Sequence, residues 1–115
     1  MSAPSAAFLN RRENDRIAIK LNCLVTFHDK TAHATTVNLS FGGACVAMPL
    51  HAGAYDFKNL TTLHIRGVGL VRVVHKWSQD RNVGMEFINP MMVRQSMARL
   101  FTQNGASQPI RMIGG

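Results

Sequence analysis

The sequence is poor in the residue types on which many catalytic, metal-binding and secreted proteins depend. It contains only two cysteines, Cys23 and Cys45, which are too few for a disulfide framework or a cysteine-based zinc site. Both lie inside apolar runs, so we expect buried free thiols. No apolar run reaches the length of about eighteen residues that a transmembrane helix needs, and residues 1–10 lack the features of a signal peptide. These absences predict a cytoplasmic protein without a membrane segment.

Groups that carry catalysis are also scarce or scattered. The five histidines are His28, His33, His51, His64 and His75. None of them has a partner at the spacing of a metal site, and the six acidic residues form no obvious acid–base pair. The sequence also lacks a nucleophile elbow and a phosphate-binding loop with a lysine. We therefore expect a protein that is not an enzyme and that holds no metal or cofactor.

Positive charge is what the sequence has in excess. Thirteen Lys and Arg against six Asp and Glu give a formal net charge of +7 and a pI of about 10.5. Arginine dominates the cations, and its planar fork of donors suits phosphates and guanine edges better than lysine does. An anionic partner is indicated, but charge alone leaves nucleotide, nucleic acid and acidic protein open.

The length of 115 residues and the 46% of hydrophobic residues indicate one globular domain. Residues 1–10 are small and rich in Ser, Ala and Pro, so we expect a flexible N-terminus. Residues 11–103 carry the regular patterns of a folded domain. Residues 104–115 form an expected flexible C-terminal tail.

Alternating hydrophobicity predicts six strands. The clearest pattern runs over residues 17–27, where apolar residues occupy every second position, and it predicts one long half-buried strand. Five shorter strands are predicted at residues 33–39, 44–48, 61–65, 70–77 and 83–88. We expect these residues in the core: Ile17, Ile19, Leu21, Val25, Phe27, Val73 and Phe87.

The pattern changes after Asn89 and Pro90, which are suited to starting a helix. Apolar residues then recur at Val93, Met97 and Leu100, the spacing of a helix with one buried face. Six short strands with one terminal helix predict an all-β fold. The specific expectation is a six-stranded antiparallel β-barrel with a short C-terminal α-helix, because closure removes exposed sheet edges.

Two polar segments stand out from this framework. The first is residues 11–16, in which Arg12 and Arg16 are four positions apart; a plain solvated charge run is the alternative interpretation. The second is residues 38–43, Asn-Leu-Ser-Phe-Gly-Gly. If Val37 and Leu39 face inward, then Thr36, Asn38 and Ser40 face outward together, and Gly43 allows a bend or the close approach of a ligand. A simple turn between strands is the alternative for this segment.

Together these segments resemble the PilZ domain family, receptors for the bacterial messenger cyclic di-GMP. That family carries an RxxxR motif followed, some twenty-odd residues later, by (D/N)xSxxG. Residues 12–16 match the first motif and residues 38–43 the second, 22 positions after Arg16. The runs ending at Trp77 and Phe87 are similar to the closing strands of the family, so the resemblance covers residues 11–101 of a stand-alone domain.

The resemblance implies that the chain binds cyclic di-GMP, a ligand with two phosphates and two guanines. It assigns ligand contacts to Arg11, Arg12, Arg16, Asn38, Ser40, Gly42 and Gly43. In the family, the residue at the position of Arg11 is linked to whether one ligand or an intercalated pair binds. The resemblance also implies that the arginine segment becomes ordered on the ligand and that a downstream protein effector responds.

The main alternative is a small basic β-barrel that binds single-stranded RNA or DNA, with Trp77 and Phe41 stacking on bases. Only eight aromatic residues are present and most fit core positions, so we do not expect nucleic acid as the partner. A domain that has lost its ligand and binds only proteins is disfavoured by the intact motifs. Lys58, Arg94 and Arg111 lie far in sequence from both motifs, and we expect them to contribute little to binding.

Overall fold

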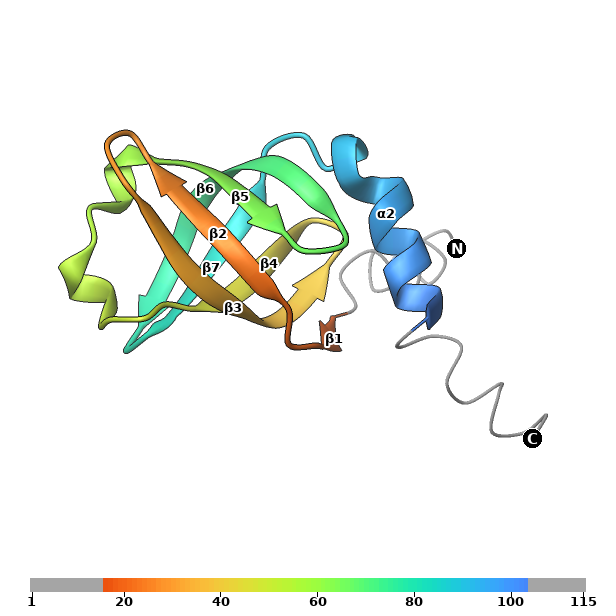
Figure 1. The fold of residues 1–115 in the computed structure, drawn as a ribbon, viewed down its shortest axis with the longest axis horizontal. Coiled ribbons are helices and arrows are strands. Elements are labelled where there is room, and N and C mark those ends of the chain that lie inside the picture. The colour runs from red at the N-terminus through yellow and green to blue at the C-terminus, as the bar shows by residue number, and fades with distance from the viewer. Residues whose placement is uncertain (1–15, 104–115) are drawn as a thin grey trace, which may run out of the picture.

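The computed structural model describes residues 16–103. Six antiparallel strands close into a barrel, and one short extra strand and one α-helix lie at one end of it (Figure 1). The elements are β1 (Ile17–Ala18), β2 (Asn22–Phe27), β3 (Thr31–Ser40), β4 (Gly43–Ala47), β5 (Leu60–Ile65), β6 (Gly69–Gln79), β7 (Asn82–Phe87) and α2 (Met91–Phe101). Two short 3₁₀ turns, Ala52–Ala54 and Phe57–Asn59, connect β4 to β5. The predicted fold class is confirmed.

The strands follow the order β1-β3-β2-β5-β6-β7-β4, and pairing between β3 and β4 closes the barrel. Most neighbours in the barrel are joined by short turns, and two of these turns depend on unusual backbone angles. Asp80 begins the two-residue turn between β6 and β7 with a φ of 56°, and Gly67 and Gly69 adopt φ values of 84° and 123° around the β5–β6 turn. Glycine adopts such angles without a steric penalty.

The core fills the barrel and extends beneath α2. Alternate residues of each strand point inward, which is why the period of two in the sequence marks the strands. The helix adds Val93, Met97 and Leu100 to the same cluster, so α2 covers one end of the barrel. The core positions predicted for Val25, Phe27, Val73 and Phe87 are confirmed by burial.

The long strand predicted at residues 17–27 is wrong, because the chain breaks into β1 and β2. Ile17, Ile19 and Leu21 are therefore only partly buried and pack against the edge of the core. The cause is the side chain of Thr36, whose hydroxyl accepts a hydrogen bond from the amide of Leu21 at 2.8 Å and donates to the carbonyl of Ile19 at 2.6 Å. This hydroxyl bridges two backbone groups at the break, where the amide of Thr36 also donates to the carbonyl of Leu21 at 2.9 Å.

The inward and outward faces predicted for β3 are also partly wrong. The register between β3 and β4 shifts between Thr36 and Asn38, which leaves Val37 as the extra residue of a β-bulge. Thr36 is consequently buried, with 1% of its surface exposed, whereas Val37 is 38% exposed. Beyond the bulge Leu39 lies in the core as predicted, but Ser40, which was predicted to face outward, is also buried, with 4% of its surface exposed.

Helix α2 begins at Met91, close to the predicted start. Pro90 occupies the N-cap position without a side-chain hydrogen bond, and the backbone carbonyl of Asn89 accepts from the amide of Met92 at 3.1 Å. Within residues 16–103, no helix is long and apolar enough to cross a membrane.

Candidate functional site

A hollow of about 520 Å³ lies on the outer surface of β3, β4, β6 and β7. Five of the seven residues predicted as ligand contacts line it, namely Arg16, Asn38, Ser40, Gly42 and Gly43. The other two, Arg11 and Arg12, lie outside the described residues, so their roles stay predictions. The hollow therefore brings Arg16 of the first motif together with the polar and glycine positions of the second.

Arg16 and Asn38 are in direct contact, although 22 positions separate them. The guanidinium Nη1 of Arg16 donates a hydrogen bond to Oδ1 of Asn38 at 3.0 Å. This contact follows from the pairing of β1 with the end of β3, which places Ala18 opposite Asn38. The arginine motif and the strand motif thus meet at one edge of the hollow.

The floor of the hollow is a row of cross-strand neighbours. Asn38 on β3 pairs with Cys45 on β4, Cys45 pairs with Gly84 on β7, and Gly84 pairs with Trp77 on β6. Neighbouring strands lie about 4.8 Å apart, so the row is about 14 Å long. Of the two central residues, Cys45 has a small side chain, and Gly84 has none and accommodates the indole of Trp77.

Trp77 forms the wall opposite Arg16. Its indole ring lies directly over Gly84, where the Cβ of any other residue would collide with the ring. The side chain nevertheless remains 45% exposed, so part of its surface is available to a ligand. The sequence did not predict Trp77 as a contact for cyclic di-GMP, because its place in the hollow depends on the register of β6 with β7.

The second row of the site differs from what the sequence suggested. Ser40 is buried, and its hydroxyl donates to the carbonyl of Gly43 at 3.3 Å. At Gly43 an added Cβ would collide with the backbone carbonyl of Met85, so this glycine is required for the close approach of β4 and β7. At Gly42, by contrast, an added Cβ would meet no atom within 4 Å. Gly42 therefore leaves open space, whereas Gly43 serves the packing of the strands.

The cysteine on the floor is buried, as predicted for both thiols. Burial raises the pKa of the Cys45 thiol above its usual value, and the positive charge of Arg16 opposes that shift. Burial raises the pKa of the Cys23 thiol to about 12. Both thiols are therefore protonated at neutral pH, and Cys45 offers the hollow a small neutral surface.

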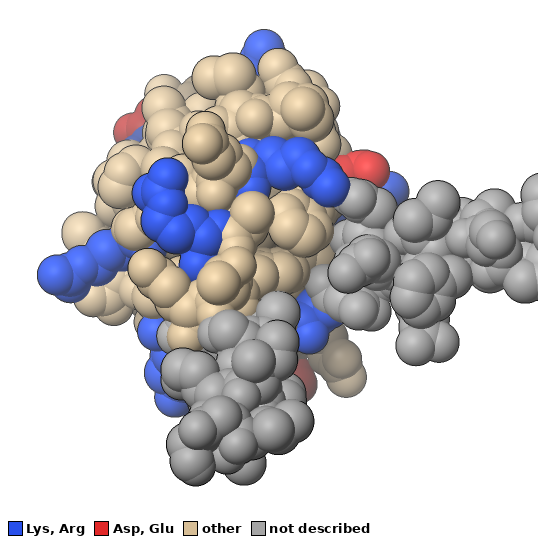
Figure 2. All heavy atoms as spheres, turned by 90° about the vertical axis from the view of Figure 1, so that its right-hand side faces the viewer, with Lys and Arg blue, Asp and Glu red and all other residues tan. Residues whose placement is uncertain are grey.

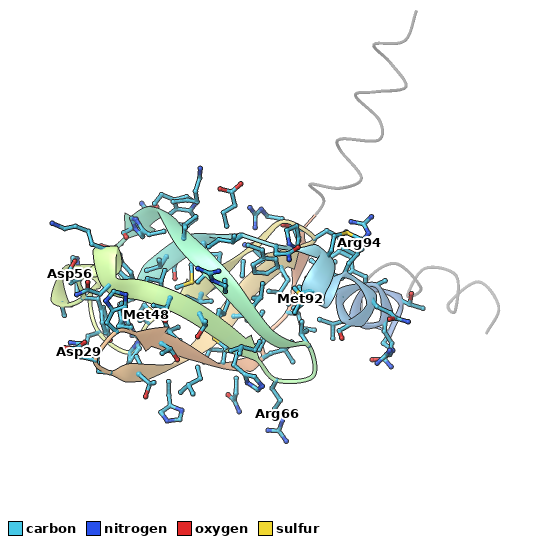
Figure 3. All side chains as sticks on the ribbon, turned by 90° about the horizontal axis from the view of Figure 1, so that it is seen from above. Asp29, Met48, Asp56, Arg66, Met92 and Arg94 are labelled. Atoms are coloured by element: carbon cyan, nitrogen blue, oxygen red, sulfur yellow. The ribbon has the colours of Figure 1, made fainter. Side chains whose placement is uncertain are left out.

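Cationic side chains surround the α2 end of the molecule. Lys and Arg are spread over this face, while Asp and Glu are confined to its margins (Figure 2). Arg66 and Arg94 lie at the α2 end, and Asp29 and Asp56 lie at the opposite end of the barrel (Figure 3). The cations at the α2 end, where Arg16 directly precedes β1, favour the approach of an anion (Figure 2).

One of these cations lies closer to the second motif than its sequence position indicates, although its expected small contribution to binding stays a prediction. Arg94 is remote from both motifs in the sequence, but its guanidinium carbon lies 4.5 Å from the ring centroid of Phe41, a residue of the second motif. The ring of Phe41 also packs against Phe101 with a centroid distance of 4.8 Å. The helical period of α2 places Arg94 beside the β3–β4 turn, so this cation touches the loop that carries Gly42.

A family model of the PilZ domain matches residues 10–103. The chain belongs to the PilZ domain family. PilZ domains are receptor domains for cyclic di-GMP, and their role is binding rather than catalysis. No curated protein and no solved structure matches the chain.

Between residues 16 and 103, no group of three or more His, Cys, Asp and Glu side chains is arranged to hold a metal ion. The hollow brings an arginine, an amide and an indole together on its walls, and these groups can recognise a ligand.

Proposed function

We propose that this PilZ domain binds cyclic di-GMP in the hollow between Arg16 and Trp77. The observation that carries the proposal is the hydrogen bond between Arg16 and Asn38, which joins the two motifs at the edge of a cavity of suitable size. A cavity of some hundreds of cubic ångströms is typical of small-molecule sites. The net charge of +7 complements a ligand with two phosphates.

The residues on the walls suit the parts of this ligand. The guanidinium of Arg16 has donors beyond the one used by Asn38, and these suit a phosphate or the O6 and N7 atoms of guanine. The exposed part of the Trp77 indole offers a flat surface on which a purine can stack. The small side chain of Cys45 leaves space for a planar base between Arg16 and the indole that covers Gly84.

We further propose that Arg11 and Arg12 complete the site from the segment before β1. Their guanidinium groups would bind the ligand from the solvent side, as the family pattern implies for this position. Ordering this segment on the ligand would change the surface presented to a downstream protein. We thus propose that the domain acts as a relay of this kind and not as an enzyme.

The test is isothermal titration calorimetry of the full chain with cyclic di-GMP. We expect saturable binding of cyclic di-GMP and little heat from GMP, because one nucleotide cannot span the whole row from Arg16 to Trp77. A random single-stranded oligonucleotide is the second control. Equal or tighter binding of the oligonucleotide would replace this proposal with the nucleic-acid alternative.

A further inference from the structure

Glu86 is an unexpected residue in a site for an anion. It lines the hollow, and among the described residues lining it Glu86 is the single carboxylate. A negative charge beside a ligand with two phosphates weakens binding unless it meets hydrogen-bond donors of the same ligand. The position of Glu86 therefore calls for a donor group, and the guanine bases provide one.

The strand register places Glu86 beside the floor of the hollow. On β7, Gly84 and Glu86 are two residues apart on the same face, a separation of about 6.8 Å along the strand. The neighbour of Glu86 on β4 is Gly43, which has no side chain to obstruct the carboxylate. A base that stacks on Trp77 above Gly84 can thus point one edge along β7 towards Glu86.

The ion pair of Glu86 with Lys76 leaves the carboxylate available to a ligand. Its Oε1 lies 3.5 Å from Nζ of Lys76, and both side chains are 57% exposed. An ion pair at such exposure contributes little, because solvent screens it and two long side chains must be ordered. Glu86 can therefore exchange the ammonium of Lys76 for a ligand donor at small cost.

We propose that Glu86 makes the site selective for guanine, an inference that rests on the proposed function. The Watson–Crick edge of guanine presents two N–H donors, on N1 and on the exocyclic N2, and a carboxylate accepts both. Adenine presents an unprotonated N1 acceptor at the same place, which repels the carboxylate. Glu86 thus attracts the correct base and rejects the wrong one.

The experiment compares cyclic di-GMP with cyclic di-AMP on the full-length chain and on Glu86→Gln. Glutamine keeps the size of the side chain but has one acceptor oxygen and an NH₂ group that opposes the guanine donors. We expect the variant to lose roughly tenfold in affinity for cyclic di-GMP, the range of one good bidentate contact to a base. Its affinity for cyclic di-AMP should stay unchanged or rise, so that the preference for guanine falls.

Lys76→Gln is the matched control on the same ion pair. Removing this cation should lower the affinity for both cyclic dinucleotides by a similar factor and leave the preference for guanine intact. If Glu86 served only to pair with Lys76, then Glu86→Gln would free this cation and raise the affinity for both cyclic dinucleotides equally. That result, or an unchanged preference for guanine in the variant, overturns the inference.

The two proposals fail in distinguishable ways. Suppose that the wild-type chain binds cyclic di-GMP, that Arg16→Ala abolishes this binding, and that Glu86→Gln keeps the full preference for guanine. Then only the role proposed for Glu86 is wrong. If the wild-type chain binds neither cyclic dinucleotide, both proposals are wrong. Thermal unfolding of each variant, which we expect to match wild type because Glu86 and Lys76 are exposed, shows that affinity changes are not due to misfolding.

Discussion

Strand β6 passes two aromatic environments within three residues, and they are built in opposite ways. His75 stacks on Phe57 with a centroid distance of 4.7 Å, and Phe57 in turn lies within 6 Å of both Phe27 and Tyr55. Trp77, after a shift in register, covers Gly84 beside an open hollow. The first region fills its space with rings, whereas the second keeps space open with small residues.

This difference teaches where the domain obtains its stability and where it binds. The ring cluster joins β2, β6 and the β4–β5 connection at the barrel end that also carries Asp29 and Asp56 (Figure 3). The hollow has a floor of Cys45 and Gly84, which contribute little buried apolar surface of their own. Substitutions in the cluster should therefore change stability, and substitutions around the hollow should change binding.

The largest effect is expected from Phe27→Ala, within the ring cluster. Phe27 is buried against Tyr55 and Phe57, and removing such a ring typically costs about 3–5 kcal/mol of unfolding free energy. Chemical denaturation measures this loss. Affinity for cyclic di-GMP, measured by calorimetry at a temperature where the variant is folded, should stay near wild type. A parallel loss of affinity would show that the two regions are not separate.

The reverse pattern is expected for Arg16→Ala. Arg16 is exposed, so its removal should leave the unfolding temperature almost unchanged. Its lost hydrogen bonds to a charged ligand correspond to about 1.5–3 kcal/mol, or roughly ten- to a hundredfold in affinity. Arg66→Ala, at the β5–β6 turn and outside the hollow, is the control and should bind almost as wild type. Equal losses for both variants would indicate a diffuse charge effect.

Two adjacent glycines sharpen the comparison within the site itself. Gly43→Ala should destabilise the domain by about 1–3 kcal/mol, because its Cβ would collide with the Met85 carbonyl of the neighbouring strand. Gly42→Ala should fold as wild type, since its Cβ enters open space. Thermal melts of the two variants test this directly. Equal stability of both would mean that Gly43 is not a packing requirement.

The smallest effect concerns the Cys23 thiol in the core. Burial raises its pKa from 9.0 to about 12, so the protonated thiol is favoured in the folded state. Its contribution to stability is complete below pH 9 and is lost as the pH rises from 9 towards 12, by up to about 1.4 kcal/mol per pH unit. Between pH 8 and pH 10, the free energy of unfolding measured by chemical denaturation should fall less for Cys23→Ala than for wild type. An identical decrease would exclude this thiol as a cause.

The periodicity of the sequence predicted most of the fold. The period of two locates five of the six barrel strands to within two residues, because each of these strands has one face in the core. It fails at Val37 and at residues 19–21. There the extra residue of a bulge and the hydroxyl of Thr36 replace regular pairing, and neither leaves a mark in the hydrophobic pattern.

The site was predictable only as far as its motifs extend. The motifs identify Arg16 and Asn38, which the structure brings into contact. They do not identify Gly84 or Glu86, because these residues join the hollow through the register of β7 with β4. The contact between Arg94 and Phe41 was missed for the same reason, since it depends on how α2 meets the β3–β4 turn.

Trp77 is the single tryptophan of the chain, so its fluorescence reports on the wall of the hollow. We therefore regard a fluorescence titration with cyclic di-GMP as the most direct test of the central claim. The account predicts a saturable change in the emission of Trp77 in the wild-type chain, with its midpoint shifted roughly ten- to a hundredfold by Arg16→Ala. Calorimetric binding of cyclic di-GMP without any change in this emission would place the ligand elsewhere, and no binding at all would contradict the proposed function.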